Sequence, residues 1–80
     1  MKTAKLRKNQ KLYFAHVTSA ILLGRQMPEA IPVYFVRMNG VLAVVRRCSD
    51  KFEHHVMLAD IFPTQQYANR RLAKIVKSYN

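Results

Sequence analysis

The sequence is short of several residue types, and each shortage excludes a class of protein. Cys48 is the only cysteine, so the chain can form no disulfide within itself. Gly24 and Gly40 are the only glycines, which leaves no glycine-rich loop of the kind that binds nucleotide phosphates. No apolar run approaches the ~20 residues that a membrane-spanning helix needs. We therefore expect neither a disulfide-stabilised scaffold, nor a nucleotide-dependent enzyme, nor an integral membrane protein.

Acidic residues are also scarce, and this bears on catalysis. The chain has four of them, which are Glu29, Asp50, Glu53 and Asp60. None falls in a pattern that indicates an active-site pocket, and no motif surrounds a nucleophilic serine or cysteine. We therefore expect no enzymatic activity and no cofactor.

Metal-binding residue types gather in one place, the segment 48–55. It holds Cys48, His54 and His55 beside two acids, and His16 could add a further ligand. Structural zinc sites take four ligands at regular spacing, and neighbouring histidines in a strand point to opposite faces. We therefore interpret the segment as a polar loop that leads into a strand, and we expect no metal site.

Length and composition favour one small folded unit. The chain has 80 residues, enough for one domain, and 50% of them are hydrophobic, which argues against disorder. We predict a flexible basic arm over residues 1–10 and a single α+β domain over residues 11–80. A lone cysteine suits a reducing compartment, and the N-terminus lacks the small residues of a signal-peptide cleavage site. We therefore expect a cytoplasmic protein.

Basic residues are abundant, and their positions say more than their number. The formal net charge is +10, of which +5 lies in residues 1–11, +1 in residues 12–63 and +4 in residues 64–80. Neither terminal segment contains an acid, whereas surfaces charged only for solubility usually mix both signs. Such a distribution indicates a polyanionic partner.

Several segments have the alternation and the residue types of strands. Lys11–Thr18 is rich in aromatic and β-branched residues, and Val56–Phe62 is a second candidate that ends at Pro63. Between them, the segment Ser19–Leu23 fits either a strand or the first turn of a helix capped by Ser19.

Asn39-Gly40 predicts a hairpin between two apolar strands. With these two residues as a type I′ turn, one face of the hairpin carries three apolar pairs. The pairs are Met38 with Val41, Val36 with Ala43, and Tyr34 with Val45. The other face carries Val33, Phe35, Leu42 and Val44. Because both faces are apolar, we expect one to pack on a helix and the other to face more sheet or a partner.

The C-terminal segment predicts the clearest amphipathic helix in the chain. Thr64 fits an N-cap, and an apolar stripe follows at helical spacing, formed by Ala68, Leu72, Ile75, Val76 and Tyr79. The opposite face is basic, with Tyr67 beside it as the best candidate to stack on a base. We expect Tyr34 and Tyr79 in the core, and Gln65, Gln66 and Asn69 in solvent.

Together these elements predict an α+β fold. We expect a small, strongly curled antiparallel sheet, an SH3-like barrel in outline, with a C-terminal amphipathic helix. A flat three-stranded sheet covered by one helix is the alternative. The run ADIFPTQQYANRRL resembles a strand-to-helix junction of small bacterial and phage proteins.

The charge distribution predicts a module that binds nucleic acid, either DNA or RNA, through phosphate contacts and with little sequence specificity. The predicted binding residues are Lys2, Lys5, Arg7, Lys8, Lys11, Arg46, Arg47, Tyr67, Arg70, Arg71, Lys74 and Lys77. A short basic chain without catalytic motifs is also similar to accessory proteins encoded by phages and plasmids, which implies binding to an acidic host protein. An exposed sheet edge could pair with that partner or with a second copy in a homodimer. We expect no membrane partner, because the apolar stripe of the helix is needed against the sheet.

Overall fold

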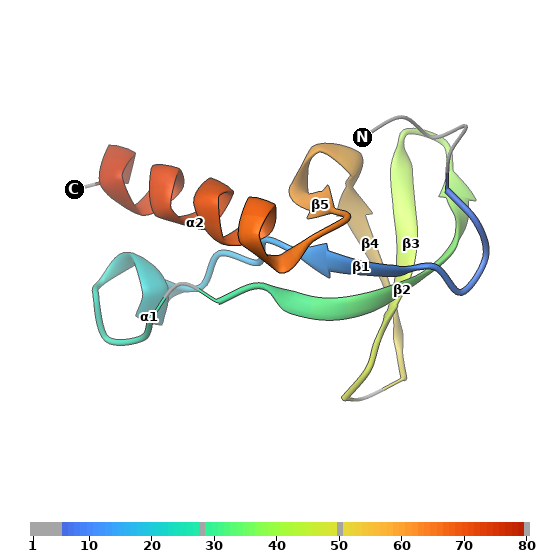
Figure 1. The fold of residues 1–80 in the computed structure, drawn as a ribbon, viewed down its shortest axis with the longest axis horizontal. Coiled ribbons are helices and arrows are strands. Elements are labelled where there is room, and N and C mark those ends of the chain that lie inside the picture. The colour runs from blue at the N-terminus through green and yellow to red at the C-terminus, as the bar shows by residue number, and fades with distance from the viewer. Residues whose placement is uncertain (1–5, 28, 50, 80) are drawn as a thin grey trace.

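A computed structural model describes residues 6–27, 29–49 and 51–79 (Figure 1). Its elements, in chain order, are β1 (Lys11–Phe14), α1 (Ser19–Leu22), β2 (Ile31–Asn39), β3 (Leu42–Arg47), β4 (Glu53–Met57), the 3-10 turn η2 (Leu58–Asp60), β5 (Ile61–Phe62) and α2 (Gln65–Tyr79). In this part of the chain, no helix is both long enough and apolar enough to cross a bilayer.

The structure confirms the α+β class, with an antiparallel sheet followed by a long C-terminal helix. Five strands are hydrogen-bonded in the order β4-β3-β2-β1-β5, so the alternative of a flat three-stranded sheet is wrong. The edge strands β4 and β5 do not pair with each other in the described residues, and the sheet is open. The strongly curled, SH3-like barrel is therefore not confirmed.

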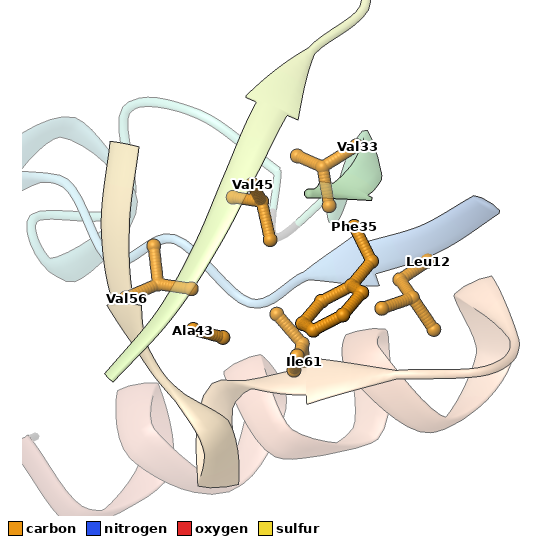
Figure 2. Packing of buried hydrophobic residues seen from close by; sticks show 7 residues of the cluster. All are labelled: Leu12, Val33, Phe35, Ala43, Val45, Val56 and Ile61. Carbon is orange, nitrogen blue, oxygen red and sulfur yellow. The ribbon is translucent and has the colours of Figure 1, made fainter. Parts of the chain in front are cut away.

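One face of the sheet, here called the core face, carries the main hydrophobic core (Figure 2). Every strand contributes at least one buried side chain to it, and the set is Leu12, Val33, Phe35, Ala43, Val45, Val56 and Ile61. Leu6, which precedes β1, and Leu58 of η2, which lies between β4 and β5, pack against the same cluster. Among the described residues, no side chain of α1 or α2 belongs to this cluster.

The opposite face of the sheet, here called the outer face, is covered by α2 only near β1 and β5. Ala68 and Leu72 of α2 are fully buried against Ala15 and Ala30, with Tyr13, Val17 and Phe62 around them. The predicted cap of this helix is confirmed, because the backbone N–H of Tyr67 donates to Thr64 Oγ1 at 3.3 Å. Small side chains on both sides let the helix approach the sheet closely.

The C-terminal half of α2 extends past the sheet, where α1 lies beside it (Figure 1). Ile75 and Val76 are half-buried there, and Tyr79 is 61% exposed. The prediction that Tyr79 packs in the core is therefore wrong, because the apolar stripe is longer than the surface available to cover it.

The hairpin turn lies one residue later than predicted. Asn39 pairs with Leu42, so the two-residue loop is Gly40-Val41. Gly40 has φ +62°, whereas Val41 is not among the residues with positive φ. A type I′ turn needs positive φ at both loop residues, which a β-branched valine resists. Positive φ at the first loop residue alone is the type II′ pattern.

The displaced turn and a bulge at Val36 change which side chains share a face. Phe35 pairs with Val45, and Tyr34 pairs with Arg46 instead of Val45. A shift of one residue moves every side chain of a strand to the other face. The predicted faces of the hairpin are therefore wrong: Phe35 is buried on the core face, and Tyr34 lies half-buried on the outer face.

Two further predictions need correction. The segment Val56–Phe62 is not one strand, because η2 interrupts it and carries the chain from edge strand β4 to edge strand β5. The strand predicted over Lys11–Thr18 ends at Phe14, and the ambiguous segment after it is helical. That short helix is capped by Thr18, whose Oγ1 accepts a hydrogen bond from Ile21 N at 3.2 Å.

The segment 6–10 is attached to the sheet. Asn9 N donates to Phe35 O at 2.7 Å, and Phe35 N donates to Gln10 O at 2.9 Å. The rest of the predicted arm, residues 1–5, lies outside the described residues.

Candidate nucleic-acid interface

Three strands bring two cations and an aromatic ring into one row on the outer face. Lys11 of β1 is directly opposite Tyr34 of β2, and Tyr34 is directly opposite Arg46 of β3. Directly opposed residues in antiparallel strands share a face, with Cβ atoms roughly 5 Å apart. Lys11 and Arg46 are exposed, and the half-buried Tyr34 lies between them.

A pocket of about 360 Å³ lies at the β3 end of this row, beside Tyr34. Its lining includes two arginines and a lysine, which are Arg46, Arg47 and Lys51, together with Cys48. Guanidinium and ammonium groups around one pocket suit an anionic oxygen, which their N–H groups bind through charge-assisted hydrogen bonds.

A second group of cations lies on α2. Tyr67, Arg70, Arg71 and Lys74 have the spacing i, i+3, i+4 and i+7, which places them on one side of the helix. The guanidinium carbon of Arg70 is 5.7 Å from the centroid of the Tyr67 ring, a cation–π distance. These four side chains and Phe62 of β5 line a pocket of about 280 Å³.

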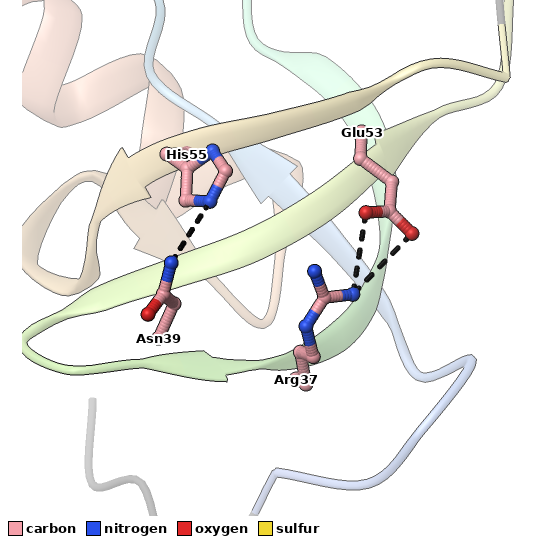
Figure 3. Close-up of polar contacts among 4 residues, drawn as sticks. All are labelled: Arg37, Asn39, Glu53 and His55. Atoms are coloured by element: carbon pink, nitrogen blue, oxygen red, sulfur yellow. Dashed lines mark hydrogen bonds and ion pairs between the residues drawn. The ribbon is translucent and has the colours of Figure 1, made fainter.

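Acidic side chains neutralise little of either group. Arg71 Nε lies 4.0 Å from Asp60 Oδ1, and both side chains are partly exposed. Figure 3 shows a second described acid, Glu53, whose Oε1 lies 3.2 Å from Nη1 of Arg37. In the described residues, the remaining cations of the two groups have no acidic side chain within ion-pair distance.

Aromatic rings connect the two groups across the outer face. Phe62, which lines the helix pocket, is directly opposite Tyr13 of β1. The Nζ of Lys11 lies 5.7 Å from the centroid of the Tyr13 ring. Lys11 is in turn opposite Tyr34, so the path from the helix pocket to the sheet pocket passes over neighbouring side chains of one face.

Of the other predicted cations, those that the structure describes lie away from this path. Lys2 and Lys5 lie outside the described residues. Arg7 and Lys8 are exposed in the segment 6–10, which lies at the opposite end of the molecule from the end of α2 (Figure 1). Lys77 is exposed near the C-terminal end of α2.

Several residues of the site were not among the binding residues predicted from the sequence. Tyr13 and Phe62 were assigned to strands, Tyr34 to the core and Lys51 to a turn. Lys51 has φ +61°, a conformation uncommon outside glycine, at the end of the loop that follows β3. Nothing in the local pattern places Lys51 beside Tyr34, since they meet only through the pairing of β2 with β3.

The histidines of the predicted polar segment are separated by the sheet. His54 pairs with Val45 of the core face, while His55 pairs with Val44 and contacts Asn39 at 3.2 Å (Figure 3). Asn69, expected in solvent, instead accepts a hydrogen bond from Ala30 N at 2.9 Å. In the ranges that the structure covers, no three His, Cys, Asp or Glu side chains gather as metal ligands would.

Comparison of the chain with protein-family models, with curated proteins and with solved structures found no match. The function is therefore inferred from the chain's own chemistry. The site offers guanidinium and ammonium donors beside partly exposed aromatic rings. Such groups bind phosphate oxygens and stack on planar groups.

Proposed function

We propose that this protein is a cytoplasmic, non-enzymatic module that binds nucleic acid electrostatically and with little sequence specificity. The observation that carries the proposal is a set of cations on the outer face and on the adjoining side of α2 that, among the described residues, have no acidic side chain within ion-pair distance. Nucleic acids carry one phosphate charge per nucleotide, and cations that replace condensed counterions gain affinity from their release.

Low sequence specificity follows from the kinds of side chain present. Lysine and arginine on an exposed face contact phosphates, which position a protein without reading bases. Gln65 and Gln66 are exposed at the start of α2, but Asn69 is engaged by the backbone N–H of Ala30. The site therefore has few side chains suited to base edges.

A salt titration tests the electrostatic mechanism. If about six phosphates are neutralised, the logarithm of the binding constant falls against the logarithm of salt concentration with a slope near −5 on a duplex. Fluorescence anisotropy of a labelled oligonucleotide at several salt concentrations measures the slope. Absence of binding at low salt, or binding that does not change with salt, would contradict the proposal.

Single substitutions locate the binding face. Arg46→Gln and Arg70→Gln each remove one cation from the site, and each is expected to reduce the salt slope by about 1. Arg25→Gln is the matched control, because it removes the same charge from an exposed position in the loop after α1. Equal losses in all three variants would show that the net charge, and not this face, attracts the ligand.

We also propose the finer shape of the sheet, an SH3-like outline. The support is the link between the two edge strands, in which only η2 separates Met57 from Ile61. Four peptide units span at most about 15 Å, whereas the edges of a flat five-stranded sheet lie about 19 Å apart. Small-angle scattering that fits an extended flat sheet better would argue against this outline.

A second candidate function is the binding of an acidic host protein, as phage and plasmid accessory proteins do. The observation that favours it is edge strand β4, which pairs only with β3 in the described residues and carries Met57 at 55% exposure. Such an edge could also pair with a second copy of the chain. Recovery of one acidic protein from a nuclease-treated extract would favour this candidate, and loss of every partner after nuclease would favour nucleic acid.

A further inference from the structure

We infer that the nucleic acid bound by this site is single-stranded, and that it crosses the outer face from α2 to β3. The inference rests on the proposed function and adds the class of ligand. The surface concerned, here called the aromatic-cationic strip, combines aromatic rings with positive groups. Its rings are Tyr67, Phe62, Tyr13 and Tyr34, and its cations are Arg70, Lys74, Lys11 and Arg46.

The strip begins in the pocket between α2 and β5. Tyr67 is 52% exposed, so its ring can accept a base, and the Arg70 guanidinium 5.7 Å from the ring is placed for the adjoining phosphate. Phe62 also lines this pocket. A ring and a cation at this spacing suit one nucleotide, whose base stacks while its phosphate is neutralised.

The middle of the strip repeats the same arrangement on the sheet. Tyr13 neighbours Phe62 across the strand pair, and the Lys11 ammonium is 5.7 Å from its ring. Both Tyr13 and Phe62 are half-buried. Their packing against α2 fixes the rings, which lowers the entropy lost when a base stacks on them.

The strip ends at β3. Tyr34 lies between Lys11 and Arg46, and the pocket beside it adds Arg47 and Lys51. Beyond Arg46 the partner on β4 is Glu53, whose carboxylate is bound by Arg37. Because the carboxylate of Glu53 repels phosphates, we expect the bound strand to end at Arg46.

The combination of aromatic rings with cations favours a single strand over a duplex. In a duplex the bases stack on each other, so a protein ring gains nothing from them and only phosphates remain as ligands. From β5 to β3 the strip crosses three strand spacings, roughly 14 Å, which matches about four stacked nucleotides at ~3.4 Å each. That length falls at the lower end of the ~4–16 nucleotides that small single-strand-binding domains cover.

Paired oligonucleotides test the inference on the full chain. We expect a 10-nucleotide DNA single strand, and the RNA of the same sequence, to bind at least about tenfold more tightly than the DNA duplex at equal salt. The DNA and RNA arms show whether the 2′-hydroxyl matters. Because the chain has no tryptophan, its tyrosine fluorescence reports directly on stacking, and single strands alone should quench it.

Three leucine variants separate stacking from general effects. Tyr34→Leu and Tyr67→Leu remove a ring from the strip, and each should weaken single-strand binding roughly tenfold while leaving duplex binding unchanged. Tyr79→Leu is the matched control, because Tyr79 is also exposed on α2 but belongs to its apolar stripe. If Tyr34→Leu unfolds, Tyr67→Leu carries the test, since its ring is exposed at the surface.

The outcomes distinguish failure of this inference from failure of the proposed function. A duplex that binds as tightly as a single strand, or ring variants that behave like Tyr79→Leu, would overturn the strip and leave the electrostatic function in place. If neither single strand nor duplex binds at low salt, the proposed function itself fails.

Discussion

At the scale of single residues, Asn69 is the side chain that fixes α2 to the loop before β2. Its Oδ1 accepts the backbone N–H of Ala30, which is only 3% exposed. Asn69→Ala would leave that donor buried without a partner, at a cost of about 1–3 kcal/mol in the free energy of unfolding. Urea denaturation followed by circular dichroism measures the loss.

Two other substitutions control for this effect. Asn69→Asp keeps an acceptor oxygen and should retain most of the stability, while Gln66→Ala changes an exposed neighbour and should have almost no effect. A loss from Gln66→Ala as large as that from Asn69→Ala would show that the loss does not come from the hydrogen bond to Ala30, because alanine itself favours a helix.

Removing the negative charge of Glu53 should increase the affinity of the protein for nucleic acid. Glu53 lies opposite Arg46 and holds Arg37 in an exposed ion pair, with side chains 49% and 54% accessible. Exposed pairs are worth about 0–1 kcal/mol, so Glu53→Gln should change stability little. The same variant frees Arg37 beside the strip, and we expect a roughly twofold to threefold gain in oligonucleotide affinity at low salt. Weaker binding by Glu53→Gln in an anisotropy titration would show that the proposed face is wrong.

At the scale of elements, the turn between β2 and β3 sets the register of these two strands, and the register decides which side chains lie on each face of the sheet. Gly40 has φ +62°, and an added Cβ there would meet no atom within 4 Å, so only backbone strain opposes substitution. Gly40→Ala should cost about 1 kcal/mol, whereas Asn39→Thr should be nearly neutral because Asn39 is a strand residue. Thermal unfolding of both variants checks this. Equal losses would place the turn at Asn39-Gly40 instead.

The hairpin shows what the sequence could predict and what it could not. Asn39-Gly40 between apolar runs correctly predicted two paired strands, because that preference is local. The register could not be predicted from the local pattern, because both candidate faces are apolar. It is decided by packing: the observed register buries Phe35 and Val45 against Leu12 and Ile61, which come from distant parts of the chain.

The same reasoning explains how much of the candidate site could be predicted. The basic side of α2, with Tyr67 beside it, follows from helical spacing alone, and the structure has these side chains together. The sheet part does not, since Tyr34 meets Arg46 only in the shifted register. The residues that share a helix face can be identified from their spacing in the sequence. The residues that meet across neighbouring strands depend on the strand register, which local patterns do not determine.

At the scale of the whole molecule, charge repulsion is the dominant electrostatic term. The net charge is +10, and the ion pairs found in the described residues, Arg37 with Glu53 and Arg71 with Asp60, offset little of it. The chain measures 35 × 25 × 21 Å. In ~0.01 M salt the Debye length is ~30 Å, so cations across the whole molecule repel one another, while at ~0.1 M it falls to ~10 Å.

Salt should therefore act in opposite directions on stability and on binding. Raising NaCl from ~0.01 M to ~0.1 M screens the repulsion, so the Tm of the free protein should rise by a few degrees. The same rise in salt weakens the oligonucleotide complex, because counterions compete for the phosphates. The difference in Tm between protein with and without a 10-nucleotide strand should therefore become smaller. Thermal unfolding with and without the strand, followed by circular dichroism at both salt concentrations, gives both quantities from one protein sample. A free-protein Tm that falls with salt would mean that attractive ion pairs outweigh the repulsion, and the cations on the outer face would then not be available to a polyanion.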